Sequence, residues 1–487
     1  MNSTFQYGTA LLPILITAAT AVVVMLAVAW RRNHGATFLL TVIGLVAALL
    51  SVPCSLSVGV LGITPLLLSG DFSAFFAALV LIASLACAVF AYAYLRGDEK
   101  HEGYPGNREE FYLLLLLSAT GGLVMAYARH FAALFIGLEL LSIPLYGMIG
   151  YAFFTRRSLE AAMKYLVLST AGSAFILFGM ALWYSEAGSL SFAALGHAGF
   201  AGPLSQLGLA LILVGFGFKI SLVPFHVWTP DVYQGAPAPA ANYLSTASKV
   251  AAFAVLLRLF ESVPLADAHW VQGLLVVIGV LSMLAGNLLA LKQVNVKRML
   301  GYSSVAHLGY LLIVLAAEGG IRTETAAVYL ATYMITMLGA FGVVGLLSSP
   351  YRGEERASLD DYRGLSRRHP GLVIAFAIMM LSLAGIPLSA GFIGKFYLMA
   401  LAVNTHLWWM LGALIVGSGI SLFYYLRAAV APFRKAEDAA TTVAVDGPHW
   451  SWKLGGLVVA LMTALVLLLG FYPQPLISLA IAAGSAG

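Results

Sequence analysis

Three lysines and one glutamate stand inside long apolar stretches of this 487-residue chain. A charged side chain near the centre of a membrane costs about 2.5–3.5 kcal/mol on insertion scales, so it must pair with an opposite charge or lose its own charge. A lysine in such a place can exchange a proton, and its charge then depends on the position of a nearby carboxylate. Static ion pairs that hold helices together are the plainer alternative. We interpret the four residues as a proton path; they are Glu139, Lys219, Lys249 and Lys395.

Two histidines, one aspartate and one further lysine are weaker candidates for the same path. His307, in the run YSSVAHLGY, and His226 could belong to a relay or could serve only as hydrogen-bonding groups between helices. Asp231 lies in a proline-rich segment between two apolar runs. Lys164 and Arg258 lie toward the ends of apolar runs, from which their long side chains can reach water.

Prolines interrupt two of the apolar runs close to a lysine. Pro224 follows Lys219, and Pro387 precedes Lys395. A proline inside a helix removes a backbone hydrogen bond and kinks or breaks the helix. Irregular backbone at membrane depth is tolerated only where it is buried in protein or lines a polar cavity. Both prolines are therefore predicted to break a helix near a translocation site in the middle of the membrane.

The elements that must position these residues are predicted to be membrane-spanning helices. Hydrophobic residues make up 61% of the chain and charged residues only 10%, and the mean hydropathy is +0.92. Soluble proteins have far fewer hydrophobic residues, and a helix crosses hydrocarbon with about 20 apolar residues. We count fourteen such segments, at approximately residues 8–30, 37–57, 72–95, 111–128, 131–154, 161–184, 205–225, 237–260, 271–291, 301–317, 324–348, 372–400, 405–430 and 454–480.

The basic residues sort to one side of this topology. Nineteen of the 26 Lys and Arg residues fall in the loops of one side, here called side A, whereas the loops of the other side, side B, carry only Arg129 and Arg322. Basic residues accumulate in cytoplasmic loops. Side A is therefore predicted to be cytoplasmic and both termini periplasmic. The first apolar run is expected to be a retained span, because no cleavable signal is evident.

Several classes of chemistry find no support in the sequence. No GxGxxG, Walker, CxxC or HExxH motif occurs in a suitable context, so no nucleotide, iron–sulfur or zinc site is predicted. Cys54 and Cys87 lie in apolar runs and are expected to be buried and unpaired. The net charge of +5 is accounted for by the loops and does not indicate a nucleic-acid partner. Glycine-rich runs such as STAGSA, residues 169–174, are interpreted as close helix packing.

The two broken helices also predict an internal repeat. They are the seventh and twelfth spans, so they cross the membrane in opposite directions. Spans 4–8 and 9–13 are then two inverted five-helix repeats, an arrangement typical of transporters. Under this pairing Glu139 on span 5 is matched by His307 on span 10. The single transmembrane domain, residues 1–487, is divided into spans 1–3, the two repeats and span 14 at residues 1–110, 111–260, 271–430 and 454–480.

Four sequence runs match a known family in order. They are SLEAAMKYLVLS, KISLVPFHVWTPDVYQGAPAP, YSSVAHLGY and LAGIPLSAGFIGKFY. Over essentially its whole length, the chain resembles the antiporter-like membrane subunits of bacterial NADH:quinone oxidoreductase, respiratory complex I, and among them the subunit N group. Lys395 favours subunit N over subunit M, which usually has a glutamate there. The lateral helix of subunit L is not expected here.

The resemblance implies an antiporter-like fold of fourteen helices that forms one of the proton-pumping units of the membrane arm. FMN, iron–sulfur clusters and the reduction of quinone are then expected in partner subunits, with no cofactor in this chain. The implied partners are other membrane-arm subunits and lipid, and the implied location is the bacterial inner membrane. Matched by motif, the relay consists of the coupled pair Glu139 and Lys219, the central Lys249, the terminal Lys395 beside the exit, and the axial His307.

Three other functions remain open at this point. A cation/proton antiporter subunit of the Mrp type shares the lysines and the glutamate, and it would be driven by an ion gradient in place of redox chemistry. A scaffold that only anchors neighbouring subunits would tolerate neutralisation of the buried charges. A solute carrier would need a substrate pocket, for which the sequence gives no signal.

Overall fold

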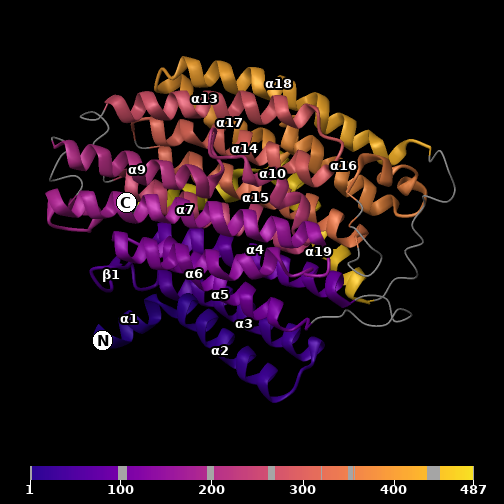
Figure 1. The fold of residues 1–487 in the computed structure, drawn as a ribbon, viewed down its shortest axis with the longest axis horizontal. Helices are drawn as coiled ribbons and strands as arrows, with labels where there is room; N and C mark the ends of the chain where they lie inside the picture. Colours follow the sequence, from indigo (N-terminus) through magenta and orange to yellow (C-terminus); the bar gives the residue numbers. More distant parts are fainter. Residues whose placement is uncertain are drawn as a thin grey trace.

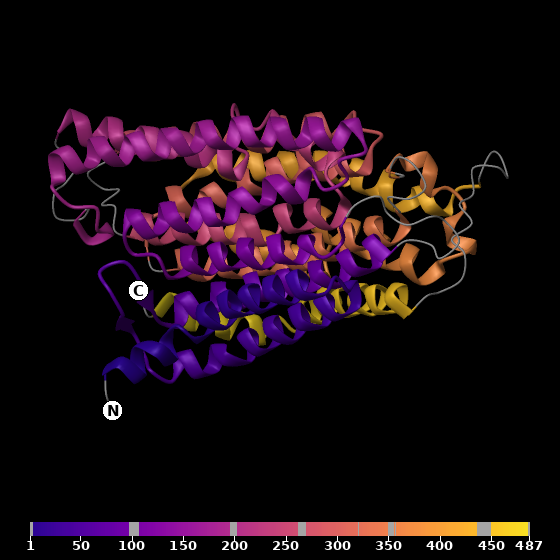
Figure 2. The ribbon, with the colours of Figure 1, turned by 60° about the horizontal axis from the view of Figure 1, so that its bottom comes forward.

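The chain folds into long helices that lie side by side in one bundle (Figure 1). The computed structural model describes residues 3–96, 107–194, 202–261, 269–319, 321–348, 355, 357–435 and 450–485. Both termini lie at the same end of the bundle (Figures 1 and 2). An even number of membrane crossings requires this arrangement.

The described elements are helices apart from one short antiparallel hairpin, β1–β2. The first part of the chain contains α1 (Ser3–Ala10), α2 (Leu12–Trp30), α3 (His34–Leu56), β1 (Leu61–Gly62), β2 (Leu68–Ser69), α4 (Asp71–Arg96), α5 (Glu110–Tyr127), α6 (Phe131–Ile149), α7 (Arg156–Ala187), α9 (Pro203–Ile220), α10 (Trp228–Gly235), α11 (Ala238–Ser245) and α12 (Ala247–Glu261). The second part contains α13 (His269–Leu291), α14 (Val296–Ala316), α15 (Arg322–Leu347), the 3₁₀ turns η2 (Leu359–Tyr362) and η3 (Leu365–Arg367), α16 (Pro370–Ala384), α17 (Ala390–Asn404), α18 (Trp408–Val430), η4 (Ala431–Phe433), α19 (Trp450–Phe471) and α20 (Gln474–Ser485).

The fourteen predicted spans are all present as helices. Thirteen helical segments among the described residues are long and apolar enough to cross a membrane. The remaining span consists of α16 and α17, two shorter apolar helices on either side of a break. The predicted all-helical fold is therefore confirmed. One boundary differs clearly, because the last predicted span, 454–480, is interrupted after Phe471 and continues as α20 from Gln474.

Polar caps, prolines and glycines set the helix ends. The Asn33 and Asn295 side chains each accept a hydrogen bond of 3.0 Å from the amide three residues further on, at the start of α3 and α14. Pro203 and Pro370 begin α9 and α16, where no intrahelical donor is needed. Gly188 ends α7 in the left-handed conformation, with φ +63°.

Glycines bring the helices of the first half close together. A Cβ atom built on Gly215 of α9 would lie 2.4 Å from the carbonyl oxygen of Gly172 in α7. The two backbones therefore touch directly, as small residues allow between membrane helices. Gly172 belongs to the run at 169–174, so its interpretation as a packing segment is confirmed.

The same close contact occurs in both halves of the chain. A Cβ atom on Gly121 of α5 would lie 2.3 Å from the amide nitrogen of Leu141 in α6, and one on Gly286 of α13 would lie 2.7 Å from that of Ala306 in α14. The pair α5–α6 thus corresponds to α13–α14, and Leu141 corresponds to Ala306. The contacts between α5 and α12 recur likewise between α13 and α18.

The broken helices lie where they were predicted, and span 8, like the last span, has an interruption that was not predicted. Between α9 and α10 the chain leaves the helix at Ser221, which has φ +66°, and between α16 and α17 at Gly385, which has φ +83°. Span 8 is also interrupted, at Thr246, whose hydroxyl donates a 2.6 Å hydrogen bond to the carbonyl of Asn242. Such a bond within the turn competes with regular helix formation, a feature that the apolar pattern did not reveal.

The centre of the bundle is formed by helices from both halves. α12, α14 and α15 are almost entirely buried. α19 and α20, yellow in Figure 2, return from the end of the chain to pack against α4 and α15.

Two side chains lie elsewhere than expected. Cys54 is exposed on the outside of the bundle, whereas Cys87 is buried, and both are free thiols. Arg258 does not reach water: it is buried and donates hydrogen bonds to the Ser73 hydroxyl (3.0 Å) and the Ala128 carbonyl (3.4 Å). Acceptors inside the protein therefore replace water for this guanidinium.

Candidate proton-translocation site

Lys219 lies in the last turn of α9 and is buried. Its ammonium group donates hydrogen bonds to the hydroxyls of Ser169 on α7 (2.7 Å) and Ser142 on α6 (2.9 Å). Among the described residues, no carboxylate lies within ion-pair distance of it. A hydroxyl group can accept a hydrogen bond from a charged ammonium group and can also form a hydrogen bond with a neutral amine. The two serines therefore do not hold the lysine in one protonation state.

Glu139 and Lys219 are each hydrogen-bonded to a serine of α7. The carboxylate of Glu139 accepts a hydrogen bond from Ser173, one helical turn from Ser169. The acid is half-buried near the middle of α6. The predicted acid–lysine pair is thus brought to one region, where its members bind serines one helical turn apart and form no ion pair with each other.

Lys249 is fully buried on α12, at the break that ends α9. Its ammonium donates hydrogen bonds to the carbonyl oxygen of Lys219 (3.0 Å) and to the hydroxyl of Ser221 (2.5 Å). The carboxyl end of a helix carries about half a negative elementary charge, because its last carbonyls lack intrahelical partners. The break of α9 therefore places a favourable field on the lysine of span 8.

Lys395 lies in the same setting in the second half. Its ammonium donates a 2.8 Å hydrogen bond to the carbonyl of Ala384, the last residue of α16. Gly385 leaves the necessary room, because a Cβ atom there would lie 2.7 Å from Cδ of the lysine. Two buried lysines are thus each bound to the carboxyl end of a half-helix, as cations are in transporters with broken helices.

His307 is held at the middle of α14 by two tyrosines. Its Nδ1 atom lies 2.7 Å from the Tyr329 hydroxyl and its Nε2 atom 3.2 Å from the Tyr425 hydroxyl. Tyr425 is hydrogen-bonded in turn to Ser303. The ring is buried, so both nitrogens are used inside the protein.

A further set of hydroxyls joins the two halves beside His307. Tyr233 of α10 donates to the Ser304 hydroxyl of α14 (3.4 Å), and Tyr333 of α15 donates to the same hydroxyl (2.9 Å). Hydroxyl groups both donate and accept hydrogen bonds, so they can pass a proton on. Sequence reasoning missed Tyr233 and Tyr333. Tyr233 lies in the proline-rich segment between two apolar runs and Tyr333 lies within an apolar run, and a hydroxyl group is the only signal of either.

The packing shifts the predicted match between the two repeats by one turn. Because Leu141 corresponds to Ala306, the counterpart of His307 is Ser142, and that of Glu139 is Ser304. Sequence reasoning paired Glu139 with His307 from the order of the spans alone, without the helix contacts that set the register. Both Ser142 and Ser304 take part in the hydrogen bonds described above.

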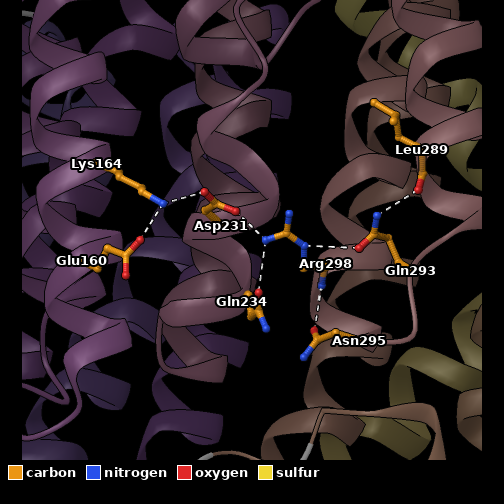
Figure 3. A network of polar contacts seen from close by, with 8 residues as sticks. All are labelled: Glu160, Lys164, Asp231, Gln234, Leu289, Gln293, Asn295 and Arg298. Carbon is orange, nitrogen blue, oxygen red and sulfur yellow. Dashed lines mark hydrogen bonds and ion pairs between the residues drawn. The ribbon is translucent and has the colours of Figure 1, made fainter.

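Asp231 and Lys164 belong to a separate polar network at side A, shown in Figure 3. Lys164 of α7 forms ion pairs of 2.7 Å with both Glu160 and Asp231, and Arg298 of α14 binds Asp231 from the other side. A cavity of about 170 Å³ lies among these side chains and Gln234. The network ties α7, α10 and α14 together at one end and offers water a polar surface.

The remaining predicted residues lie in or beside the helix breaks. Pro224 is in the segment between α9 and α10, and Pro387 is in the segment between α16 and α17. His226 is half-buried next to Pro224, and its Nδ1 atom has no hydrogen-bond partner among the described residues. The part of the chain that the structure describes contains no group of three or more His, Cys, Asp or Glu that could hold a metal ion.

A family model and a curated protein match this chain in sequence. Residues 128–421 match the family described as NADH:quinone oxidoreductase/Mrp antiporter, TM. NADH-quinone oxidoreductase subunit N of Ectopseudomonas mendocina (strain ymp) is 55% identical over 479 residues, which cover 98% of this chain and 96% of that protein. The chain belongs to the subunit N family of NADH:quinone oxidoreductase. The thirteen long apolar helices among the described residues agree with a multi-pass membrane protein.

Solved structures share the fold of this chain. A chain in respiratory complex I from Thermus thermophilus with bound aureothin superimposes with a TM-score of 0.81 and 35% identity, covering 96% of this chain and 98% of that one. A chain of the Mrp complex from Dietzia sp. DQ12-45-1b gives a TM-score of 0.83 with 22% identity, covering 99% and 97%. The second likeness concerns the fold alone. The subunit N family therefore has the same helix bundle as an Mrp complex chain.

Proposed function

We propose that this chain is a proton-translocating subunit of the membrane arm of a bacterial NADH:quinone oxidoreductase. The 55% identity to a subunit N protein and the match to a chain of respiratory complex I support this assignment. NADH, FMN, iron–sulfur clusters and quinone reduction belong to the partner subunits in this proposal. The neighbouring membrane-arm subunits and lipid are the partners of this chain.

One structural observation carries the translocation role. Lys219, Lys249 and Lys395 are buried and are held by hydroxyls and main-chain carbonyls, with no ion-pair partner among the described residues. A permanent ion pair would trap the proton on the lysine, whereas neutral acceptors leave its release possible. A purely structural lysine would be expected to have a buried carboxylate beside it.

The proposed path runs along the middle of the bundle. A change driven by quinone reduction moves the charge of Glu139 relative to Lys219, and each of the two residues is hydrogen-bonded to a serine of α7. Lys219 passes its proton to Lys249, which binds the end of the same helix.

The second half of the path leads to the exit. The hydroxyls of Tyr233 and Ser304 connect the first half to the surroundings of His307. Lys395, on the broken span 12, receives the proton and releases it to side B. Each transfer depends on neighbouring charges that shift the proton affinity of a buried group.

Orientation and domain division are parts of the same proposal. Side A, with most of the basic loop residues, faces the cytoplasm, and both termini face the periplasm. The repeats occupy residues 111–260 and 271–430, after spans 1–3 in 1–110 and before span 14 at 454–480. A membrane-impermeant thiol reagent on intact cells should label a single cysteine placed at the C-terminus. Labelling only after the cells are opened would reverse the orientation.

Purification of the complex through a tag on this chain tests the function directly. The eluate should contain hydrophilic partner subunits and show inhibitor-sensitive NADH:quinone reductase activity. Lys219→Ala should lower proton pumping in proteoliposomes, whereas Lys292→Ala, which changes an exposed loop lysine, should not. Full pumping by the Lys219 variant would refute the role of this lysine.

A cation/proton antiporter subunit is the alternative function, supported by the family description, which names the Mrp antiporter, and by the fold shared with an Mrp complex chain. It predicts sodium-dependent proton exchange in vesicles without NADH, and purification with antiporter-like subunits only. A scaffold predicts unchanged pumping when the buried lysines are neutralised in an assembled complex. The same purification and vesicle assays separate all three functions.

A further inference from the structure

Two of the buried lysines face an aromatic ring in place of a carboxylate. The ammonium nitrogen of Lys249 lies 5.1 Å from the ring centre of Trp228, and that of Lys395 lies 5.6 Å from the ring centre of Tyr310. Both distances are within the range of cation–π attraction, about 6 Å. The attraction is stronger where water is excluded, and all four side chains are buried.

Each ring is fixed by a hydrogen bond at its polar edge. The indole nitrogen of Trp228 donates to the carbonyl of Phe218 (3.0 Å). This contact joins α10 to the end of α9, so the ring is held against the break that also binds Lys249. A tryptophan at this place thus has a defined position.

Tyr310 is fixed by a buried asparagine. Asn287 of α13 donates to the Tyr310 hydroxyl (2.8 Å) and accepts a hydrogen bond from Tyr424 of α18 (3.0 Å). Gly417 makes room for this triad, because a Cβ atom there would lie 2.7 Å from the asparagine nitrogen and 3.0 Å from the Tyr310 hydroxyl. Three helices therefore cooperate to place one ring beside Lys395.

We propose that Trp228 and Tyr310 are positioning residues that stabilise the protonated forms of Lys249 and Lys395. A ring face attracts an ammonium ion without carrying a charge of its own. It therefore makes the cation tolerable in the interior, yet it leaves the proton free to move, which a carboxylate would not. This inference deepens the proposed function and rests on it.

A test that varies the pH must take into account the other titratable groups around Lys395. His307 on α14 lies beside the ring of Tyr310, with 5.5 Å between the two ring centres. Tyr329 of α15 and Tyr425 of α18 bind that histidine. Within the described residues, neither α16 nor α19 contributes an ion pair to Lys395. Tyr310 can therefore be changed without removing a counter-ion.

The groups around Lys249 are equally limited. Lys219 supplies its carbonyl and Ser221 its hydroxyl, and both belong to the end of α9. Among the described residues of α4, α5, α6 and α15, no acid forms an ion pair with Lys249. Trp228 on α10 is the aromatic side chain beside it, so its replacement isolates the contribution of the ring.

The test compares substitutions that keep and remove the ring. In the purified complex in proteoliposomes, protons pumped per NADH are measured across pH for Tyr310→Phe and Tyr310→Leu. On the alkaline side of the pH profile, protons pumped per NADH decline. Loss of the ring should move this alkaline limb to lower pH by about one unit, because the lysine then holds its proton less tightly. Tyr310→Phe keeps the ring face and should leave the limb in place. Phe131→Leu, a buried ring that packs on Phe192, is the matched control and should have no effect.

Two outcomes would overturn the inference. An unchanged limb in Tyr310→Leu would show that the ring does not act on the lysine. Equal shifts in the Phe and Leu variants would assign the effect to the hydrogen bond. If Tyr310→Leu does not assemble, Trp228→Leu against Trp228→Phe gives the same comparison for Lys249.

Lys395→Ala separates this inference from the function beneath it. Full pumping by that variant would refute the role of Lys395 itself, and the role of the ring with it. Lost pumping in Lys395→Ala, together with an unchanged limb in Tyr310→Leu, would refute only the positioning role.

Discussion

A buried ion pair at side A gives the sharpest quantitative prediction. The side chains of Lys297 and Glu355 are 1% and 13% exposed and are in contact. Lys297 also donates to the carbonyl of Ala236 (2.5 Å), and Glu355 accepts from the amide of Ala238 (2.9 Å). The pair thus holds both sides of the turn that joins α10 to α11.

The cost of breaking this pair follows from its burial. Glu355→Gln leaves the ammonium of Lys297 without a counter-ion, and breaking a buried pair in this way costs about 3–5 kcal/mol. Exchanging both partners for neutral residues is often close to neutral in stability, because the desolvation of both charges is then avoided. We therefore expect the double variant Lys297→Met/Glu355→Gln to be more stable than Glu355→Gln.

Thermal inactivation of the purified complex measures the difference. If the pair is lost in the rate-limiting opening, about 3 kcal/mol shortens the half-life of NADH:quinone reductase activity about 100-fold at a fixed temperature. The half-life of the double variant should recover to within about ten-fold of the wild type.

An exposed ion pair provides the control. Asp360 pairs with Arg363 with a side chain that is 69% exposed, and such pairs contribute about 0–1 kcal/mol. Asp360→Asn should therefore change the half-life less than about five-fold. A wild-type half-life for Glu355→Gln, or a double variant as short-lived as the single one, would refute the reasoning.

Three further substitutions test other contacts. Gly385→Ala adds a Cβ atom 2.7 Å from Cδ of Lys395 in a left-handed conformation, so protons pumped per NADH should fall while native gels still show the complex; unchanged pumping would contradict the close contact. Ser169→Ala removes one of the two hydroxyls that bind Lys219, and because a hydrogen bond to a charged group contributes about 1.5–3 kcal/mol, pumping at mildly alkaline pH should fall about ten-fold. Equal rates for variant and wild type in proteoliposomes would refute that role of the hydroxyl. Gly121→Leu would force α5 and α6 apart, and immunoblots of membranes should show little assembled complex; normal assembly would contradict direct backbone contact.

The sequence was sufficient to predict the parts of the fold that depend on hydrophobicity and on prolines. Long apolar runs predict the spans, and prolines beside Lys219 and Lys395 predict the breaks. Burial of these lysines follows from their place within the runs, and the structure agrees. These features are local, so a single sequence reveals them.

The remaining features depend on hydrogen bonds and helix contacts that hydropathy does not register. Thr246 interrupts span 8 through a hydroxyl bond that hydropathy does not register. Arg258 lies near a span end yet finds acceptors inside the protein. The register between Ser142 and His307 depends on how glycines seat neighbouring helices. Helix packing, which no local pattern encodes, decided the last two of these features.

The hydroxyl groups around His307 have a consequence for the interval between two proton transfers. In a chain of hydroxyls, each group that passes a proton onward releases its own hydrogen and keeps the incoming one. Tyr233 and Tyr333 both donate to the Ser304 hydroxyl, so the O–H bond of Tyr333 must turn away before Ser304 can pass a proton to it. The groups must rotate back before a second proton can follow in the same direction. Such a chain of hydroxyls transfers one proton and cannot transfer a second until its O–H bonds have rotated back.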